Sequence, residues 1–475
     1  MKLGKGAIYL LIAISVTVFM DGLDGSIVNI ALPIIAEYFG TDTGTVSWVS
    51  IAYLLVVAGS LIIFGKIAAR GYLKRIFLLG IALFTIASVI CGLSPSLLVL
   101  IGGRVLQGLG ASMIISCAPI ICVKHLPADI LGMSIGLISS VSAISFCLGP
   151  ALGGLIAYAL SWSWIFWINI PIGIFAFIFV SRVLPKDVPE HTGKFDIPGA
   201  ILLFIAIAAG TFGLERMPHL GVDNPLILST VIVAAAALVL FCIVELKAKE
   251  PLLNIRIFKL FPVVAVILAF LIMKIVVSGL FYLLPFYFSN AMGLDTLLSG
   301  ILMLIGPAGM VICSVPFAKW SDRTGRRWFC VVSTVILVIV SIFFSFLSPT
   351  WSIVFIIVAL AILGIAAGIG SGPSTARIIE TVPEEEKDSG STVMMTCLYL
   401  GTVIGTAVYA AGFTFFSSKG ESVVSFADLP TDIFMNGFHG AMVIGLILAV
   451  ASCILSLVVK DRKKAAKENA ETEEK

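Results

Sequence analysis

Apolar residues run along this chain in long blocks that short polar segments separate. A helix rises about 1.5 Å per residue, so about 20 apolar residues are enough to cross the hydrocarbon core of a bilayer. The blocks predict an all-α polytopic membrane protein with 14 transmembrane helices. We expect the spans at 7–36, 46–69, 75–93, 97–123, 130–159, 164–184, 197–215, 225–246, 261–290, 296–319, 327–347, 351–377, 389–415 and 435–460.

Composition agrees with this pattern. Charged residues make up 12% of the chain, whereas soluble domains carry about 25%. The nine cysteines show no CxxC spacing and the four histidines are isolated, so we expect buried thiols, no metal site and no cofactor. A net charge of +3 is nearly neutral and gives no reason to expect a nucleic-acid partner.

The basic residues predict the orientation. If both termini are cytoplasmic, 26 of the 30 Lys and Arg residues fall in predicted cytoplasmic segments, and only Arg216 and Lys419 fall outside. Cytoplasmic loops carry such an excess of basic residues. We therefore expect a multi-pass protein of the plasma (inner) membrane, a monomer in the bilayer, with both termini cytoplasmic.

The sequence contains an internal repeat. Residues 64–70 match residues 317–323, and the pair Gly149 and Gly153 matches Gly401 and Gly405. Repeated halves with a site at their interface are the general plan of secondary transporters. We predict an N-terminal six-helix bundle at 1–185, a two-helix insert with linkers at 186–260, a C-terminal six-helix bundle at 261–460, and a charged cytoplasmic tail at 461–475.

Two aspartates lie at the middle of the first predicted span. Asp21 and Asp24 are three residues apart and share a helix face. An ionised side chain at the bilayer centre costs about 2.5–3.5 kcal/mol, so an acid there indicates function. No other acid falls well inside a predicted span. The pair is a candidate for proton coupling at a central cavity; the alternative is a permanent salt bridge to Arg104 or Lys274.

Two basic residues also lie inside spans. Arg104 begins the segment Arg104-Val105-Leu106-Gln107-Gly108, and its charge could help an aspartate release a proton; the alternative is simple helix packing by the glycines. Lys274 stands where the repeat places the counterpart of Asp21. It could pair with the aspartates or contact an anionic substrate group. The expected cavity residues are Asp21, Asp24, Gln107, Lys274, Tyr282 and Tyr287, although such aromatic residues can equally face lipid or pack.

Three further segments are candidates for gating. Gly149, Pro150, Gly153 and Gly154 of the fifth span could form a seal, or could be ordinary close packing of small residues. The loop after the tenth span could form a cytoplasmic latch, or could simply set topology; the first repeat has the related loop. The expected gating residues of these two loops are Gly65, Arg70, Asp322, Arg323, Gly325 and Arg326.

These residues together resemble the 14-span drug:proton antiporter branch of the major facilitator superfamily. The resemblance covers nearly the whole chain. It implies that Asp24 and Arg104 carry proton coupling, that the fifth-span motif favours export and that the basic loops control the inside gate. The matching segments are 23–33, 104–108, 149–154, 162–173 and 250–254.

The chain departs from the family pattern at three places. Ala69 stands where the first loop motif has an acid, the thirteenth span has no acid, and Lys274 is additional. With both aspartates ionised, the two acids and two bases of the predicted midplane sum to zero. A lipophilic cation, a neutral compound, a zwitterion or an anion therefore all remain open as substrates.

These observations support three hypotheses in order. The first is a proton-coupled exporter of amphiphilic compounds (multidrug efflux) that works by alternating access, with the proton gradient as its energy source. The second is an exporter of an anionic or zwitterionic metabolite, such as a peptide, siderophore or amino acid, that uses Lys274. The third is a membrane sensor without transport. We find no nucleophile–base arrangement or nucleotide loop, so we do not expect an enzyme.

Overall fold

The computed structural model describes residues 5–126, 131–187, 196–221, 223–248, 255–382, 387–418 and 429–459. Within these ranges the chain is helical and contains no strand, which confirms the predicted fold class. The helices are α1 (Lys5–Tyr38), α2 (Thr43–Ile67), η1 (Ala68–Tyr72), α3 (Leu73–Gly92), α4 (Leu97–His125), α5 (Leu131–Ala159), α6 (Trp164–Trp167), α7 (Asn169–Val183), α8 (Ile197–Leu220), α9 (Pro225–Lys247), η3 (Ile255–Lys259), α10 (Phe261–Phe286), η4 (Tyr287–Ala291), α11 (Thr296–Thr324), α12 (Arg327–Ser345), α13 (Ile353–Thr381), α14 (Lys387–Ser418) and α15 (Thr431–Val458).

The described helices include 13 that are long and apolar enough to cross a membrane. The apolar part of α8, Pro198–Leu214, is shorter than these. The fourteenth span therefore stays a prediction. The domain boundaries also stay predictions, and the tail at 461–475 lies outside the described residues.

Polar residues begin several of the helices at the sites where backbone N–H groups lack a partner. The carboxylate of Asp42 accepts a hydrogen bond from Thr45 N at 2.9 Å, and that of Asp295 accepts one from Leu298 N at 2.7 Å. Such caps satisfy the first N–H groups of a helix. Between α2 and α3 the chain turns at Gly71, whose φ of +96° favours glycine.

The helices form two matching sets. In the first set α1 packs on α5 and α7, and α4 packs between α2 and α3; in the second set α10 packs on α14 and α15, and α13 packs between α11 and α12. A matching contact closes each set. Lys74 Nζ donates to the carbonyls of Ser181 and Leu184 near the end of α7, and Arg327 Nη2 donates to Leu457 O near the end of α15. We call these sets the first half (α1–α7) and the second half (α10–α15).

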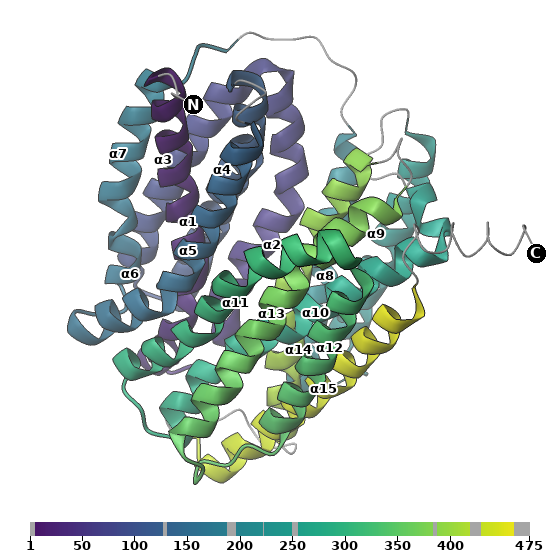
Figure 1. Cartoon of the computed structure of the whole chain (residues 1–475). Helices are drawn as coiled ribbons and strands as arrows, with labels where there is room; N and C mark the ends of the chain where they lie inside the picture. Colours follow the sequence, from purple (N-terminus) through teal and green to yellow (C-terminus); the bar gives the residue numbers. More distant parts are fainter. Residues whose placement is uncertain are drawn as a thin grey trace, which may run out of the picture.

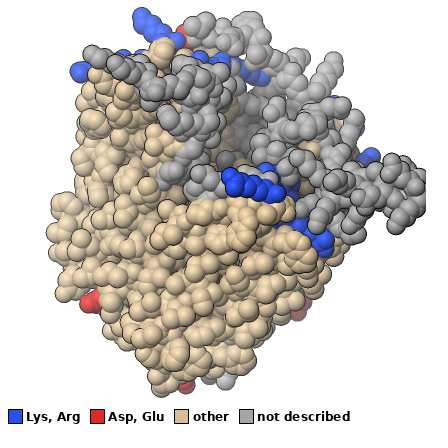
Figure 2. Space-filling view, in the orientation of Figure 1, with Lys and Arg blue, Asp and Glu red and all other residues tan. Residues whose placement is uncertain are grey.

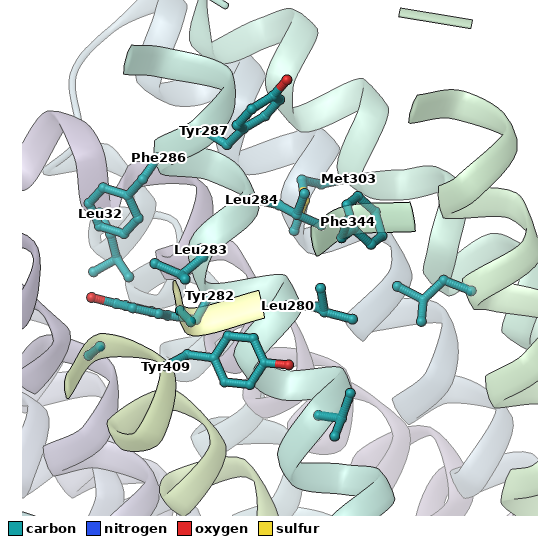
Figure 3. Close-up of a cluster of buried hydrophobic side chains, with 14 of the residues drawn as sticks. Leu32, Leu280, Tyr282, Leu283, Leu284, Phe286, Tyr287, Met303, Phe344 and Tyr409 are labelled. Carbon is teal, nitrogen blue, oxygen red and sulfur yellow. The ribbon is translucent and has the colours of Figure 1, made fainter. Parts of the chain in front are cut away.

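The two halves meet mainly at one end. Figure 1 shows their helices diverging toward the end at which α1 begins and converging toward the other end. Lys and Arg side chains gather at the first of these ends in Figure 2, so we call it the basic end and the opposite one the far end. Near the far end a continuous apolar cluster joins α1 to α10; in Figure 3, Leu283 and Phe286 lie beside Leu32.

The insert helices lie against both halves on one side. Helix α8 packs on α2 and on α14, and α9 packs on α8. A small cluster contains Ile51 and Leu55 of α2 with Val403 and Ala407 of α14, and Phe204 of α8 packs against it. The first helix of the insert therefore covers the seam between α2 and α14.

Candidate functional site

Asp24 lies at the centre of the first half and has no exposed surface. Its carboxylate accepts three hydrogen bonds: from Arg104 Nη1 at 2.5 Å, from Gln107 Nε2 at 3.1 Å and from Asn169 Nδ2 at 2.8 Å. These donors come from α4 and from the first residue of α7. A buried carboxylate needs such partners because its desolvation is costly. The cluster as built holds the ionised form of Asp24.

Arg104 is buried as completely as its partner, with 1% of its surface exposed. Its Nε donates to Val49 O at 2.9 Å, and its Nη1 also donates to Gln107 Oε1 at 2.8 Å. The guanidinium carbon lies 4.1 Å from the ring centroid of Tyr53, a distance suited to a cation–π interaction. The arginine is therefore held by an anion, by neutral acceptors and by an aromatic face.

Gln107 extends the cluster to a further helix. Its Nε2 donates to Ser88 Oγ on α3 at 2.9 Å while also donating to Asp24. The network thus ties α1 to α3, α4 and α7 inside one half. Proton-coupling roles for Asp24 and Arg104 stay a prediction, but the structure brings them together with Gln107 in one buried contact.

Three members of this cluster were not among the predicted site residues: Asn169, Tyr53 and Ser88. Asn169 belongs to the segment 162–173 that resembles the antiporter family. After the short helix α6, the turn at Ile168 places Asn169 at the start of α7 and its amide against Asp24. A carboxamide inside a span needs a polar partner, so Asn169 itself was the available signal.

Asp21 has different surroundings from Asp24. Its side chain is partly exposed, and its carboxylate accepts one recorded hydrogen bond, from Tyr53 Oη at 2.6 Å. Among the described residues the ion pairs are Arg104–Asp24 and Arg75–Asp187, so Asp21 and Lys274 are not brought into contact.

Lys274 lies in α10 and is partly exposed. Its Nζ lies 5.3 Å from the ring centroid of Phe270, and no carboxylate of the described residues lies within ion-pair distance. The backbone of α14 passes close by, since a methyl group at Gly401 would lie 2.6 Å from Lys274 Cβ. Its predicted contact with a substrate anion stays a prediction.

Tyr282 and Tyr287 have no exposed surface, although both were expected at a cavity wall. The hydroxyl of Tyr282 donates to Thr43 O across the two halves, and the Tyr287 ring packs on Phe438 with centroids 4.9 Å apart. Figure 3 shows both rings within the far-end cluster. In this conformation the two halves enclose that end of α10, so both tyrosines serve as core residues.

The fifth-span motif packs on two helices at once. A methyl group at Gly153 would lie 2.7 Å from Ile27 Cγ1 of α1, and Gly149 lies equally close to Ser26. On α11, a methyl group at Gly300 would lie 2.3 Å from the carbonyl oxygen of Pro150 and 3.1 Å from the Cα of Gly154. The motif therefore makes a backbone-to-backbone contact between the halves near the far end.

The two loop motifs lie at the basic end. Gly65 is in α2 near Ser116, and Arg70 is in η1. Gly325 ends α11 with a φ of +100°, between Arg323 in the last turn and Arg326 before α12. The side chain of Asp322 lies outside the described residues, so its predicted latch stays untested. No group of three or more His, Cys, Asp or Glu residues in the described ranges could hold a metal ion.

The model of the Major Facilitator Superfamily matches residues 14–406 of this chain. The chain belongs to the Major Facilitator Superfamily. It is thus a multi-pass membrane protein of a transporter family, and its buried Asp24–Arg104 pair lies in the first half of a superfamily fold.

Several relatives of this superfamily member are drug-resistance proteins, but their names differ. The chain is 32% identical over 412 residues to the riboflavin transporter RibZ of Clostridioides difficile, covering 85% of this chain and 87% of that protein. It is 26% identical over 399 residues to the multidrug resistance protein Stp of Mycobacterium tuberculosis, covering 84% and 74%. A bacterial homologue of the lysosomal transporter Spinster, solved in an inward-facing and unoccupied conformation, has the same fold at 14% identity, with a TM-score of 0.67 and coverage of 96% and 98%.

Proposed function

We propose that this protein is a proton-coupled exporter of amphiphilic compounds that works by alternating access. Membership of the superfamily supports transport, and the multidrug resistance relatives support export of amphiphiles. The observation that carries the coupling is the buried Asp24–Arg104 pair with its supporting amides. No other ion pair of the described residues is buried on both sides.

The cluster suggests how a proton would act. While Asp24 is ionised, its charge balances that of Arg104 inside a region from which water is excluded. Protonation of Asp24 leaves the guanidinium without its anion, and breaking a buried pair in this way costs about 3–5 kcal/mol. Movement of α1 away from α4, which exposes the arginine to water or substrate, lowers that cost. Protonation therefore favours a different packing of the first half.

The orientation follows from the charges. We place the basic end in the cytoplasm, because cytoplasmic segments carry the excess of Lys and Arg. In this conformation the contact of Pro150 and Gly154 with Gly300 closes the far end, which would face outside. The site would then open to the cytoplasm, where an exporter takes up its substrate. One proton moving inward supplies about 2.3 kcal/mol per 100 mV of membrane potential.

The test is transport by everted membrane vesicles with ethidium and riboflavin as probes. The Asp24→Asn variant should insert into the membrane but lose proton-driven uptake of every probe that the wild type transports. Asp42→Asn is the matched control, because this acid caps α2 far from the cluster. Undiminished proton-driven uptake by Asp24→Asn would overturn the coupling assignment.

Lys274 favours a second candidate, an exporter of an anionic or zwitterionic metabolite. Its ammonium group lies near the middle of α10 with an aromatic ring but no carboxylate in ion-pair range among the described residues. The likeness to a riboflavin transporter also supports a metabolite. Lys274→Met should abolish transport of anionic probes only if this candidate holds. Lys186→Met, a change at an exposed lysine, is the control.

A further inference from the structure

The two aspartates of α1 differ in access. Asp24 is fully buried and accepts hydrogen bonds from three donors, whereas Asp21 is partly exposed and accepts one, from Tyr53. Asp21 lies about one helical turn closer to the start of α1, and hence closer to the basic end. A proton arriving from that end meets Asp21 before it meets Asp24.

Tyr53 contacts both sites with different parts of one side chain. Its hydroxyl donates to Asp21, and its ring face lies 4.1 Å from the guanidinium carbon of Arg104, which in turn holds Asp24. The tyrosine is 97% buried, and α4 fixes its backbone: a methyl group at Gly108 would lie 2.7 Å from Tyr53 O. Tyr53 therefore cannot change its contact with one site without disturbing the other.

Tyr53 also lies on a helix that joins the two halves. Ile51 and Leu55, its neighbours two positions away on α2, pack with Val403 and Ala407 of α14. A shift of α2 at Tyr53 therefore reaches this contact between the halves.

We propose that Asp21 is the acid that exchanges protons with the basic end, and that Tyr53 transmits its charge state to the Asp24–Arg104 pair and to the α2–α14 contact. This inference rests on the proposed proton-coupled export and assigns two of its steps. Asp24 then acts as the buried counter-ion of Arg104, and Tyr53 as a positioning residue.

The physical step is a change in one hydrogen bond. An ionised Asp21 takes a charge-assisted hydrogen bond from the Tyr53 hydroxyl, which is stronger than a bond between neutral groups. When Asp21 gains a proton, that bond weakens and Tyr53 is free to move. The titratable groups that act on Asp21 from packed helices are Tyr53, Asp24, Arg104 and Tyr399 of α14. On the α5 side it meets serines, since Ser142 and Ser145 line Gly22.

The first experiment measures protonation without any substrate. The purified full-length protein is treated with N,N′-dicyclohexylcarbodiimide, which reacts with protonated carboxyl groups in apolar surroundings, and peptides are analysed by mass spectrometry across a pH series. We expect labelling at Asp21 and not at Asp24. In Tyr53→Phe the midpoint of Asp21 labelling should move to higher pH by about one unit, because the ionised form loses a hydrogen-bond donor.

Controls and a second readout keep the two parts separable. Tyr158→Phe, which alters an exposed tyrosine of α5, should leave the midpoint unchanged. In vesicle transport, Asp21→Asn and Asp21→Asn/Tyr53→Phe should lose the same fraction of proton-driven uptake, because both act through one contact. Labelling at Asp24 instead of Asp21, or an unchanged midpoint in Tyr53→Phe, would overturn the inference. Asp21 labelling with the expected shift but no proton-driven uptake by the wild type would overturn the proposed export while leaving the assignment of the proton site intact.

Discussion

The first-half cluster and its counterpart in the second half occupy equivalent places but contain opposite chemistry. Gly108 of α4 packs on the Tyr53 carbonyl of α2, and Gly364 of α13 packs on the Gly306 carbonyl of α11. Counted from these two glycines, Leu360 and Leu363 stand where the first half has Arg104 and Gln107.

The repeat extends this contrast to the first helix of each half. At the offset of the matching loop segments, Lys274 and Val277 stand where the first half has Asp21 and Asp24. Leu360 and Leu363 are buried in the second half, as Arg104 and Gln107 are in the first. The same helix packing therefore tolerates either an apolar core or a charged cluster. This difference indicates that the cluster is kept for function, because a buried ion pair is weak support for stability.

The largest expected effect comes from breaking the cluster on one side. Arg104→Leu leaves the Asp24 carboxylate buried without its cation and should lower stability by about 3–5 kcal/mol. Asp24→Val/Arg104→Leu/Gln107→Leu copies the second half into the first and should regain most of that loss, because a well-packed apolar replacement is often neutral or stabilising. The measurement is thermal unfolding of the detergent-solubilised protein. A triple variant no more stable than the single one would show that the halves are not interchangeable in this way.

A second prediction concerns the contact between the halves. Gly300→Ala forces a methyl group against the Pro150 carbonyl and should destabilise the closed far end by about 1–3 kcal/mol, the usual cost of overpacking. Gly102→Ala is the control, since nothing lies within 4 Å of its added methyl group. The readout is the reaction of a cysteine introduced at Thr296 with a membrane-impermeant thiol reagent, in a background free of native cysteines. Equal reaction rates in both variants would contradict the closure assigned to this contact.

The apolar blocks were enough to predict the helices, because each block is long and bounded by polar caps and loops. Asp24, Arg104 and Gln107 were also predictable, since a charged or amide group inside a span is rare enough to stand out. Asn169 and Tyr53 were not, because their roles depend on which helices pack together and not on their own spacing. The burial of Tyr282 and Tyr287 was also unpredictable, since it depends on the conformation in which the halves meet.

The smallest expected effect tests the symmetry of the basic end. Lys74→Met and Arg327→Met each remove a cation from the end of the last helix of its half, and each should cost about 0.5–1.5 kcal/mol, the net contribution of an ordinary hydrogen bond. Thermal unfolding should place the two variants close together. A large loss in only one of them would limit the repeat to the sequence.

The most direct test of proton-coupled export is substrate-dependent proton movement in proteoliposomes that contain a pH-sensitive dye. Riboflavin and ethidium are supplied in turn, without any imposed gradient, to the wild type and to the Asp24→Val/Arg104→Leu/Gln107→Leu variant. The account predicts that at least one probe drives proton movement in the wild type and that neither does so in the variant, although the variant is folded. Equal substrate-driven proton movement by both proteins would contradict the account, because coupling would then not require the charged cluster of the first half.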